Sequence, residues 1–272
     1  MFISYAQNSE DVLLYRALRD VERGCYIDVG AADPVFDSVT LAFYQRGWRG
    51  INLEPSPAPF KRLMELRRED INLNLAIGDV EGTTSFFVVR GADVLSTALP
   101  DQMQARAGQG YNAERIEVPV RRLARVLEEH AIGTIHFLKI DVEGLERAVL
   151  AGADLRRFRP WIILIEATAP NSQQPTHDQW EDLLIAVDYR FAWFDGLNRY
   201  YVAAEKSELA PVLQMQPNVF DKFKKYDEAL AQHQLAEARA REQQLRQALR
   251  SAHEELAAQR LELEALRRRV TG

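Results

Sequence analysis

Two patterns of apolar and polar residues divide this chain. Up to about residue 222, short apolar runs alternate with stretches of helical periodicity. Beyond Phe223 no Gly or Pro occurs before Val270, and apolar residues recur in steps of seven. The first pattern is typical of strands alternating with helices, and the second of a coiled coil. We therefore expect one domain over 1–222 and a C-terminal coiled-coil helix over 223–272.

The first part is expected to form a doubly wound, mainly parallel α/β sheet. Its strands are expected at 25–29, 50–54, 71–77, 84–89, 116–121, 134–140, 160–166, 190–195 and 199–204. Its helices are expected at 8–21, 36–46, 57–68, 122–131, 144–152 and 176–187. The turn-forming stretch Asp195–Asn198 separates the last two strands, which predicts an antiparallel hairpin near the sheet edge. The aperiodic stretch 92–114 is expected to be a lid or a disordered insert.

Apolar residues of the second part fall on two heptad positions. Leu235, Leu249, Leu256, Leu263 and Val270 share one position, which Glu242 interrupts. Three residues later, Ala231, Ala238, Leu245, Ala252 and Leu266 share another, which Gln259 interrupts. This seam predicts a homo-oligomer, as a dimer or a trimer, over roughly 60 Å of helix at 1.5 Å per residue. The alternative is a single solvated helix.

Composition narrows the class of protein. The 272 residues include 34 Lys+Arg and 40 Asp+Glu, a net charge of −6, which argues against a general nucleic-acid binder. One cysteine, Cys25, excludes an internal disulfide framework and favours a reducing compartment. Neither a secretory signal nor an apolar run long enough to span a membrane is visible. We expect a soluble, cytoplasmic protein.

The turn after the first domain strand is acidic. Asp28-Val29-Gly30-Ala31-Ala32-Asp33 contains one Gly between two acids, and Glu54 closes the next strand. A ribose-binding acid is expected at that spacing, whereas acids within the turn would repel a pyrophosphate. The pattern therefore favours a ligand with ribose and positive charge, such as S-adenosylmethionine, with Asp28 or Asp33 on its amino group. The alternative is an ordinary turn with a capping Asp.

Further ionisable residues cluster at other strand ends. Lys139, Asp141 and Glu143 alternate where one strand leaves the sheet, and Glu166 ends the next one. Ligands of open sheets bind at these carboxyl ends, so the group is a candidate active site. His177 starts the following expected helix and is a base, a ligand or simply a helix-start residue. The weaker Leu75–Asp79 stretch places Ala76 where an adenine edge would lie.

From about Ser4 to Glu205, roughly three quarters of its length, the chain resembles FkbM-type S-adenosylmethionine-dependent methyltransferases. The matching segments are Tyr5-Ala6-Gln7-Asn8-Ser9-Glu10-Asp11, Tyr26-Ile27-Asp28-Val29-Gly30-Ala31, Asn52-Leu53-Glu54-Pro55, Leu138-Lys139-Ile140-Asp141-Val142-Glu143-Gly144 and Ile165-Glu166. One departure is Ala32-Asp33-Pro34, where the family commonly has Asn-Asp-Gly. The resemblance implies a class I methyltransferase fold and O-methylation of a sugar or polyketide hydroxyl.

The resemblance and the strand-end pattern together give a set of expected site residues. Those expected at the cofactor are Tyr5, Gln7, Asp11, Asp28, Gly30, Ala31, Asp33, Glu54, Pro55, Ala76 and Asp141. Those expected to be catalytic are Asp141, Lys139, Glu143, Glu166 and His177. Asp141 is the first candidate for the base that a hydroxyl acceptor requires. Asp141 and Glu166 are also candidate ligands of a Mg²⁺ that would lower the pKa of the alcohol.

The resemblance also suggests a setting. We expect a sugar or glycan acceptor, free or lipid-linked, in bacterial surface polysaccharide synthesis. A glycosyltransferase partner would place the protein at the inner membrane. Two other functions stay open: an inactive methyltransferase-like scaffold that recruits partners through the coiled coil, and a nicotinamide oxidoreductase. The acids and missing glycines of the first turn disfavour the oxidoreductase.

Overall fold

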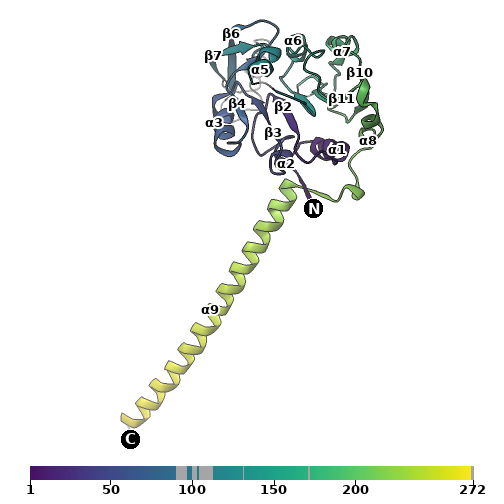
Figure 1. Cartoon of the computed structure of the whole chain (residues 1–272). Helices are drawn as coiled ribbons and strands as arrows, with labels where there is room; N and C mark the ends of the chain where they lie inside the picture. Colours follow the sequence, from purple (N-terminus) through teal and green to yellow (C-terminus); the bar gives the residue numbers. More distant parts are fainter. Residues whose placement is uncertain (90–96, 100–102, 104–112, 131, 171, 271–272) are drawn as a thin grey trace. The chain divides into compact units, whose positions relative to one another are not determined.

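The structure is a computed structural model that describes residues 1–89, 97–99, 103, 113–130, 132–170 and 172–270. It divides into two compact units, Met1–Phe223 and Lys224–Gly272 (Figure 1). The first unit is mixed α/β, as the sequence predicts. The second contains helix α9 (Tyr226–Val270). Most of the expected 92–114 insert lies outside the described residues.

The main sheet is Rossmann-like. Within the described residues it has seven strands, in the order β10-β11-β9-β8-β2-β3-β4. They are β2 (Cys25–Val29), β3 (Arg49–Leu53), β4 (Ile71–Leu73), β8 (Phe137–Ile140), β9 (Ile162–Glu166), β10 (Tyr189–Phe194) and β11 (Asn198–Ala203). β11 is antiparallel to both its neighbours, which confirms the predicted hairpin. The other strands run parallel, and their order reverses between β2 and β8.

Helices cover both faces of this sheet. One face carries α1 (Glu10–Ala17), α2 (Leu41–Tyr44) and α8 (Ala210–Leu213), and the other carries α5 (Leu123–Glu129), α6 (Glu146–Ala151) and α7 (Glu181–Ile185). α3 (Pro57–Leu66) follows β3; it starts with a proline, whose fixed φ suits a first helical position. Short 3₁₀ turns are η2 (His177–Gln179), η3 (Ala204–Leu209) and η4 (Val219–Asp221).

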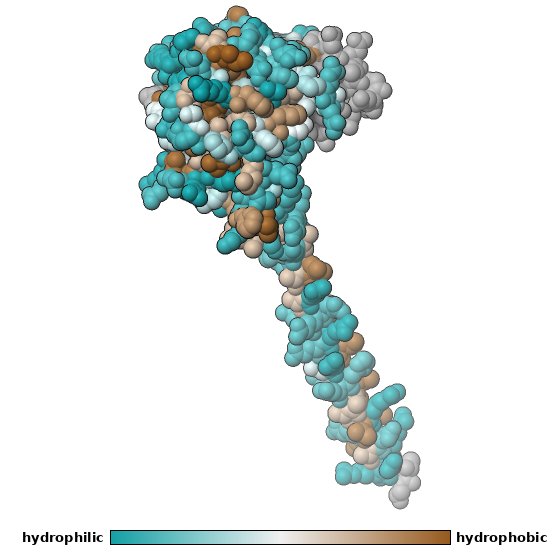
Figure 2. Space-filling model, turned by 90° about the vertical axis from the view of Figure 1, so that its right-hand side faces the viewer, coloured by the Kyte–Doolittle hydropathy of each residue, from teal (hydrophilic) through white to brown (hydrophobic). Residues whose placement is uncertain are grey.

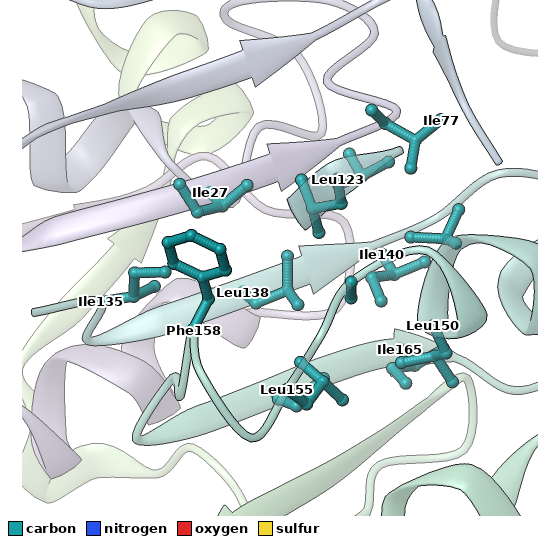
Figure 3. Close-up of a cluster of buried hydrophobic side chains, with 14 of the residues drawn as sticks. Ile27, Ile77, Leu123, Ile135, Leu138, Ile140, Leu150, Leu155, Phe158 and Ile165 are labelled. Atoms are coloured by element: carbon teal, nitrogen blue, oxygen red, sulfur yellow. The ribbon is translucent and has the colours of Figure 1, made fainter. Parts of the chain in front are cut away.

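Strand residues alternate between two cores, as expected for a sheet covered on both faces. On β2, Tyr26 enters the cluster with α1 and α2, whereas Ile27 enters the cluster with α5, α6 and α7. Ile27 and Leu138 are paired in register on β2 and β8, and Figure 3 shows their side chains in one apolar layer. Because both layers are buried, the carboxyl ends of the strands are held in fixed positions.

The structure differs from the sequence prediction at 71–77. This segment is split into β4 and β5 (Ala76–Ile77), and β5 leaves the main sheet. It joins a smaller sheet with β6 (Gly82–Val89) and β7 (Ala113–Arg121). The division occurs because Asn74 uses its side-chain amide to bind the carbonyls of Glu54 and Pro55, at 2.8 and 3.0 Å. The short strands β1 (Phe2–Ser4) and β12 (Phe223–Lys225) were not expected.

Candidate functional site

A cavity of about 390 Å³ lies where the parallel strands of the main sheet end. Gly30, Glu54, Asp141 and Glu166 contribute to its wall, at the ends of β2, β3, β8 and β9 respectively. The order of the strands reverses between β2 and β8, which is where open α/β sheets bind ligands. The cavity is therefore the candidate active site.

Most of the residues expected from the sequence meet at this cavity. Those that line it are Gln7, Gly30, Ala31, Glu54, Pro55, Ala76, Lys139, Asp141, Glu143 and Glu166. They come from segments that are far apart in the chain, and the sheet order arranges them in sequence along the cavity. Glu54 and Ala76 lie toward the β3 end, Gly30 and Asp141 lie between, and Glu166 lies toward the β9 end.

Glu54 is a fixed hydrogen-bond acceptor at the β3 end. Its side chain accepts the N–H of Ser56 at 2.7 Å through Oε1 and the N–H of Ala32 at 2.8 Å through Oε2. Only 5% of the residue is exposed, and burial raises the pKa of its carboxyl to about 7. Each carboxylate oxygen can accept a further hydrogen bond, so this group can receive the two hydroxyls of a ribose.

The first turn needs its glycine for a reason that the sequence did not reveal. Gly30 has φ +78°, and a Cβ atom there would lie 1.8 Å from the carbonyl oxygen of Asp141. The glycine thus permits close approach of the loop after β8. Ala32 also has a left-handed φ, +48°. Asn tolerates that conformation better than Ala, which accounts physically for the family's Asn at this place.

Lys139 joins the ends of β2 and β8. Its Nζ donates to the Gly30 carbonyl at 2.8 Å and lies 3.3 Å from Asp28 Oδ1 and 3.3 Å from Asp141 Oδ2. Burial lowers the pKa of Lys139, but the charges of both carboxylates outweigh it and raise the pKa above its usual value. Lys139 therefore stays an ammonium group that positions Asp141. Asp28 also accepts a hydrogen bond from Thr40 Oγ1 at 3.0 Å. It is buried behind Lys139 and does not line the cavity.

Glu166 has the most perturbed carboxyl of the cavity wall. Burial raises its pKa, and the neighbouring carboxylates of Asp141 and Glu143 raise it further. Its carboxyl is in hydrogen-bonding contact with that of Asp141. Two carboxyl groups this close share a proton, because both do not readily ionise together. The pair can hold or release a proton at the β9 end of the cavity.

Among the cavity residues that sequence reasoning did not single out are Glu10 and Asn198. Asn198 Nδ2 donates to Glu10 Oε1 at 2.8 Å, and the Asn8 N–H donates to Glu10 Oε2 at 2.8 Å. Burial raises the pKa of Glu10 to about 7. The position of Glu10 in a matching segment of the family was an available signal. No local signal marks Asn198, since it reaches the cavity only through the insertion of β11 beside β9.

Four other expected residues lie away from the cavity wall. Asp11 is fully buried, where it accepts Ser4 Oγ at 2.6 Å and the Tyr5 N–H at 2.8 Å, and burial raises its pKa to about 6. These hydrogen bonds connect the end of β1 to the start of α1. Tyr5 directs its hydroxyl to Gln45, whose Nε2 donates at 3.1 Å.

Asp33 and His177 are the other two. Asp33 caps its own turn by accepting the N–H groups of Val35 and Phe36, at 2.8 and 2.9 Å, and it pairs with Arg62. His177 Nε2 lies 3.2 Å from Asp178 Oδ1. In this structure neither side chain faces the candidate site.

The described residues give no support to the expected Mg²⁺. Asp141 and Glu166 face one another. Across the described ranges, however, no three His, Cys, Asp or Glu side chains are grouped as a metal ion would require.

None of the described helices is long and apolar enough to span a membrane.

Comparison with known proteins gives one family and several solved structures, among them the following two. A crystal structure of a methyltransferase FkbM from Methylobacillus flagellatus KT has 15% identity and a TM-score of 0.43, covering 66% of this chain and 44% of that one. A crystal structure of a fibrillarin/Nop5p complex has 12% identity and a TM-score of 0.39, and the match covers 73% of this chain and 81% of that one. This chain thus spans less than half of the FkbM structure's length. No curated protein matches the sequence.

The family model of the methyltransferase FkbM domain matches residues 28–191, which are 164 of the 272 residues. The match includes the turn after β2, the end of β3 and the ends of β8 and β9, which together build the cavity. S-adenosylmethionine is the methyl donor that such a family implies. The chain belongs to the FkbM methyltransferase family.

Proposed function

We propose that Met1–Phe223 is a class I, S-adenosylmethionine-dependent O-methyltransferase that acts on a hydroxyl of a neutral sugar or glycan. The observation that carries this proposal is the order of groups along one cavity. The hydrogen-bond acceptor Glu54 lies at one end, and the carboxyl pair of Asp141 and Glu166 lies at the other. Between them, Lys139 holds Asp141 in position. A ribose acceptor at one end and a proton acceptor at the other suit methyl transfer from S-adenosylmethionine to a hydroxyl.

The charges of the cavity fit this donor. Among the described residues that line it, six are acidic and one, Lys139, is basic. The acids are Glu10, Asp37, Glu54, Asp141, Glu143 and Glu166. Such a wall repels phosphates and favours a cationic ligand. Glu54 would hold the ribose, and the apolar Leu75, Ile77 and Phe86 would flank the base.

When bound, S-adenosylmethionine supplies a methyl group on a positively charged sulfur. Transfer would form a bond from the acceptor oxygen to the methyl carbon while the carbon–sulfur bond breaks with its electron pair on sulfur, and the hydroxyl proton would have to leave. The Asp141–Glu166 pair receives that proton. A nearby cation lowers the pKa of a carboxyl, so donor binding would free Glu166 to act as the base. Lys139 holds Asp141 in place.

The acceptor end of the cavity supports a neutral, hydroxyl-rich substrate. Glu10, Asn198 and Thr168 offer hydrogen-bonding side chains there, whereas an acidic wall disfavours sugar phosphates. We propose that the acceptor is a free or lipid-linked glycan of a bacterial surface polysaccharide. We also propose that a glycosyltransferase is a partner of this protein. A polyketide hydroxyl is the alternative acceptor of the same reaction.

The test is a substrate panel with methyl-labelled S-adenosylmethionine and the full chain. Label should enter neutral saccharides as a methyl ether, detected by mass spectrometry, and should not enter the matched sugar phosphates. Transfer only to amines or to polyketide alcohols would refute the glycan acceptor. Failure to bind S-adenosylmethionine in calorimetry would refute the enzyme itself and favour an inactive scaffold.

A further inference from the structure

Helix α9 exposes an apolar stripe along its length. Its heptad leucines are each more than half exposed: Leu235 52%, Leu245 66%, Leu249 59%, Leu256 57%, Leu263 53% and Leu266 53%. In Figure 2 hydrophobic patches recur along the helix between hydrophilic side chains. Exposed leucines in a sustained heptad pattern are typical of a surface that another helix covers.

The residues beside this stripe carry a charge pattern. Leu235, Leu249, Leu256 and Leu263 define heptad position a, and Ala238, Leu245, Ala252 and Leu266 define position d. Position e then holds Arg239, Arg246, His253, Arg260 and Arg267. Position g holds Gln234, Arg241, Ala248, Glu255, Glu262 and Arg269. These two positions flank the seam and decide how coiled-coil helices pair.

We propose that α9 pairs with the α9 of a second copy of this chain, parallel and in register. In that arrangement each g residue faces the e residue five positions later on the other helix. Glu255 then faces Arg260 of the second copy, and Glu262 faces its Arg267. Both contacts occur twice by symmetry, which gives four opposite-charge pairs in the C-terminal half of the seam.

Two kinds of like-charged contact oppose these pairs. The two Glu242 side chains share an a position and meet in the seam. In the same register Arg241 faces Arg246 of the second copy. Arg246 Nη2, however, lies 2.6 Å from Glu242 Oε1 on its own helix, and that carboxylate partly neutralises it. The same contact partly neutralises Glu242. Four opposite-charge pairs therefore face three like-charged contacts, each weakened within its own helix, and the parallel register keeps a net electrostatic gain.

The antiparallel arrangement lacks this gain. There, e residues face e residues and g residues face g residues. The five e residues from Arg239 to Arg267 are arginine or histidine, so their contacts bring like charges together at neutral or lower pH. Charge alone thus selects the parallel pair.

One polar interruption of the stripe, Gln259, fixes the register. Gln259 occupies a d position and Glu242 an a position. In register, the two Gln259 amides meet and can hydrogen-bond to each other. A slip by one heptad would place Gln259 against Ala252 or Leu266 and leave its amide unpaired in the seam.

The width of the stripe indicates two helices. Larger bundles bury a third apolar position, e or g. Here position e is basic and position g is mostly polar or charged. Two copies cover an a/d stripe completely. This inference does not depend on the proposed methyl transfer.

Disulfide trapping in the full chain tests the orientation. In a Cys25→Ser background, Leu263→Cys should form a disulfide-linked pair under mild oxidation. The matched control Ala257→Cys, on the outer face at position b, should not. Leu235→Cys co-expressed with Leu266→Cys should give no mixed disulfide, because 31 residues separate the two sites by about 46 Å along the axis. A mixed disulfide, or no disulfide at Leu263→Cys, would overturn the parallel pair.

Charge reversal tests the partner. Glu255→Arg with Glu262→Arg should raise the dimer dissociation constant by roughly a hundredfold, as four attractive contacts become repulsive. Adding Arg260→Glu and Arg267→Glu should restore it to within about threefold. Light scattering should give twice the chain mass of 31.1 kDa for the unaltered protein. A single-chain mass, a mass of three or more chains, or an unchanged dissociation constant in the first variant would overturn the proposal.

Discussion

The two units of this chain use charged residues in opposite ways. In Met1–Phe223, Asp11, Asp28 and Glu54 are at most 5% exposed and are held by hydrogen bonds or by Lys139. In Lys224–Gly272, the charged side chains of α9 are exposed and surround half-exposed leucines. The carboxylates near the site of the first unit are therefore buried, whereas the charged side chains of α9 lie at the surface.

This difference predicts which property each charge controls. A buried carboxyl interacts strongly with its neighbours because water does not screen it, so it shifts pKa values and positions ligands. An exposed charge contributes little to stability but can select a partner. We therefore expect substitutions in the first unit to change chemistry and folding, and substitutions in α9 to change assembly alone. The following experiments test that separation.

Glu166→Gln should have the largest effect. It keeps the shape of the side chain but removes the proton acceptor at the cavity, and turnover should fall roughly 10³-fold. The measurement is the rate of methyl transfer at saturating substrate. His177→Gln is the matched control, since His177 lies outside the cavity wall, and it should retain turnover. A fully active Glu166→Gln would remove Glu166 from the mechanism.

Arg67→Met should have the largest effect on folding. Arg67 is fully buried, lies 3.9 Å from Asp70, and donates to the Pro34 carbonyl at 3.1 Å and to Ser38 Oγ at 2.9 Å. Its removal leaves Asp70 buried without its cation and should lower the free energy of unfolding by about 3 kcal/mol in denaturant titrations. The partly exposed Arg62→Met should lose under about 1 kcal/mol. Equal losses would contradict the contrast between buried and exposed charge.

Glu54→Gln should weaken donor binding. One of its two backbone hydrogen bonds and its charge are lost, so we expect S-adenosylmethionine to bind about thirtyfold more weakly, or about 2 kcal/mol, by calorimetry. Glu143→Gln also lies on the cavity wall but away from the β3 end, and it serves as the comparison. If both variants bind equally well, Glu54 is not the ribose acceptor.

The same variant should change how stability depends on pH. The folded pKa of Glu54 is about 7, against an ordinary 4.5, because of burial. The unfolded chain therefore loses its proton first, and the native state loses stability as pH rises from about 4.5 to 7. Without this carboxyl, the loss between pH 5 and pH 8 should shrink by about 1 to 2 kcal/mol. Denaturant titrations across that range measure it, and an identical slope in both proteins would show that Glu54 ionises normally.

Removal of 224–272 should have the smallest effect on the site. We expect S-adenosylmethionine affinity to stay within about twofold, since the cavity is built from the first unit alone, while the assembly falls to a single chain in light scattering. A truncated domain that binds the donor poorly would show that α9 contributes to the site. An unchanged number of chains would place the oligomer contact in the first unit.

The sequence predicted the parts of this site that depend on local pattern. Apolar periodicity located the strands from β2 to β11 to within a few residues, and acids at strand ends marked Glu54, Asp141 and Glu166. These signals work because a buried parallel strand must be apolar and its carboxyl end is where charge can remain. They failed for 71–77, where the side chain of Asn74 divides one apolar run between two sheets.

Long-range pairing decided the rest. Asp28 and Asp33 look alike in the sequence, but only Asp28 lies beside Lys139, because β2 and β8 are neighbours in register. Asn198 reaches Glu10, 188 residues away, because β11 inserts between β9 and β10. Spacing along a chain records which face of an element a side chain occupies, not which element packs next to it. The sequence by itself therefore determined the elements and the acidic character of the site, and the tertiary structure determined which acids face one another.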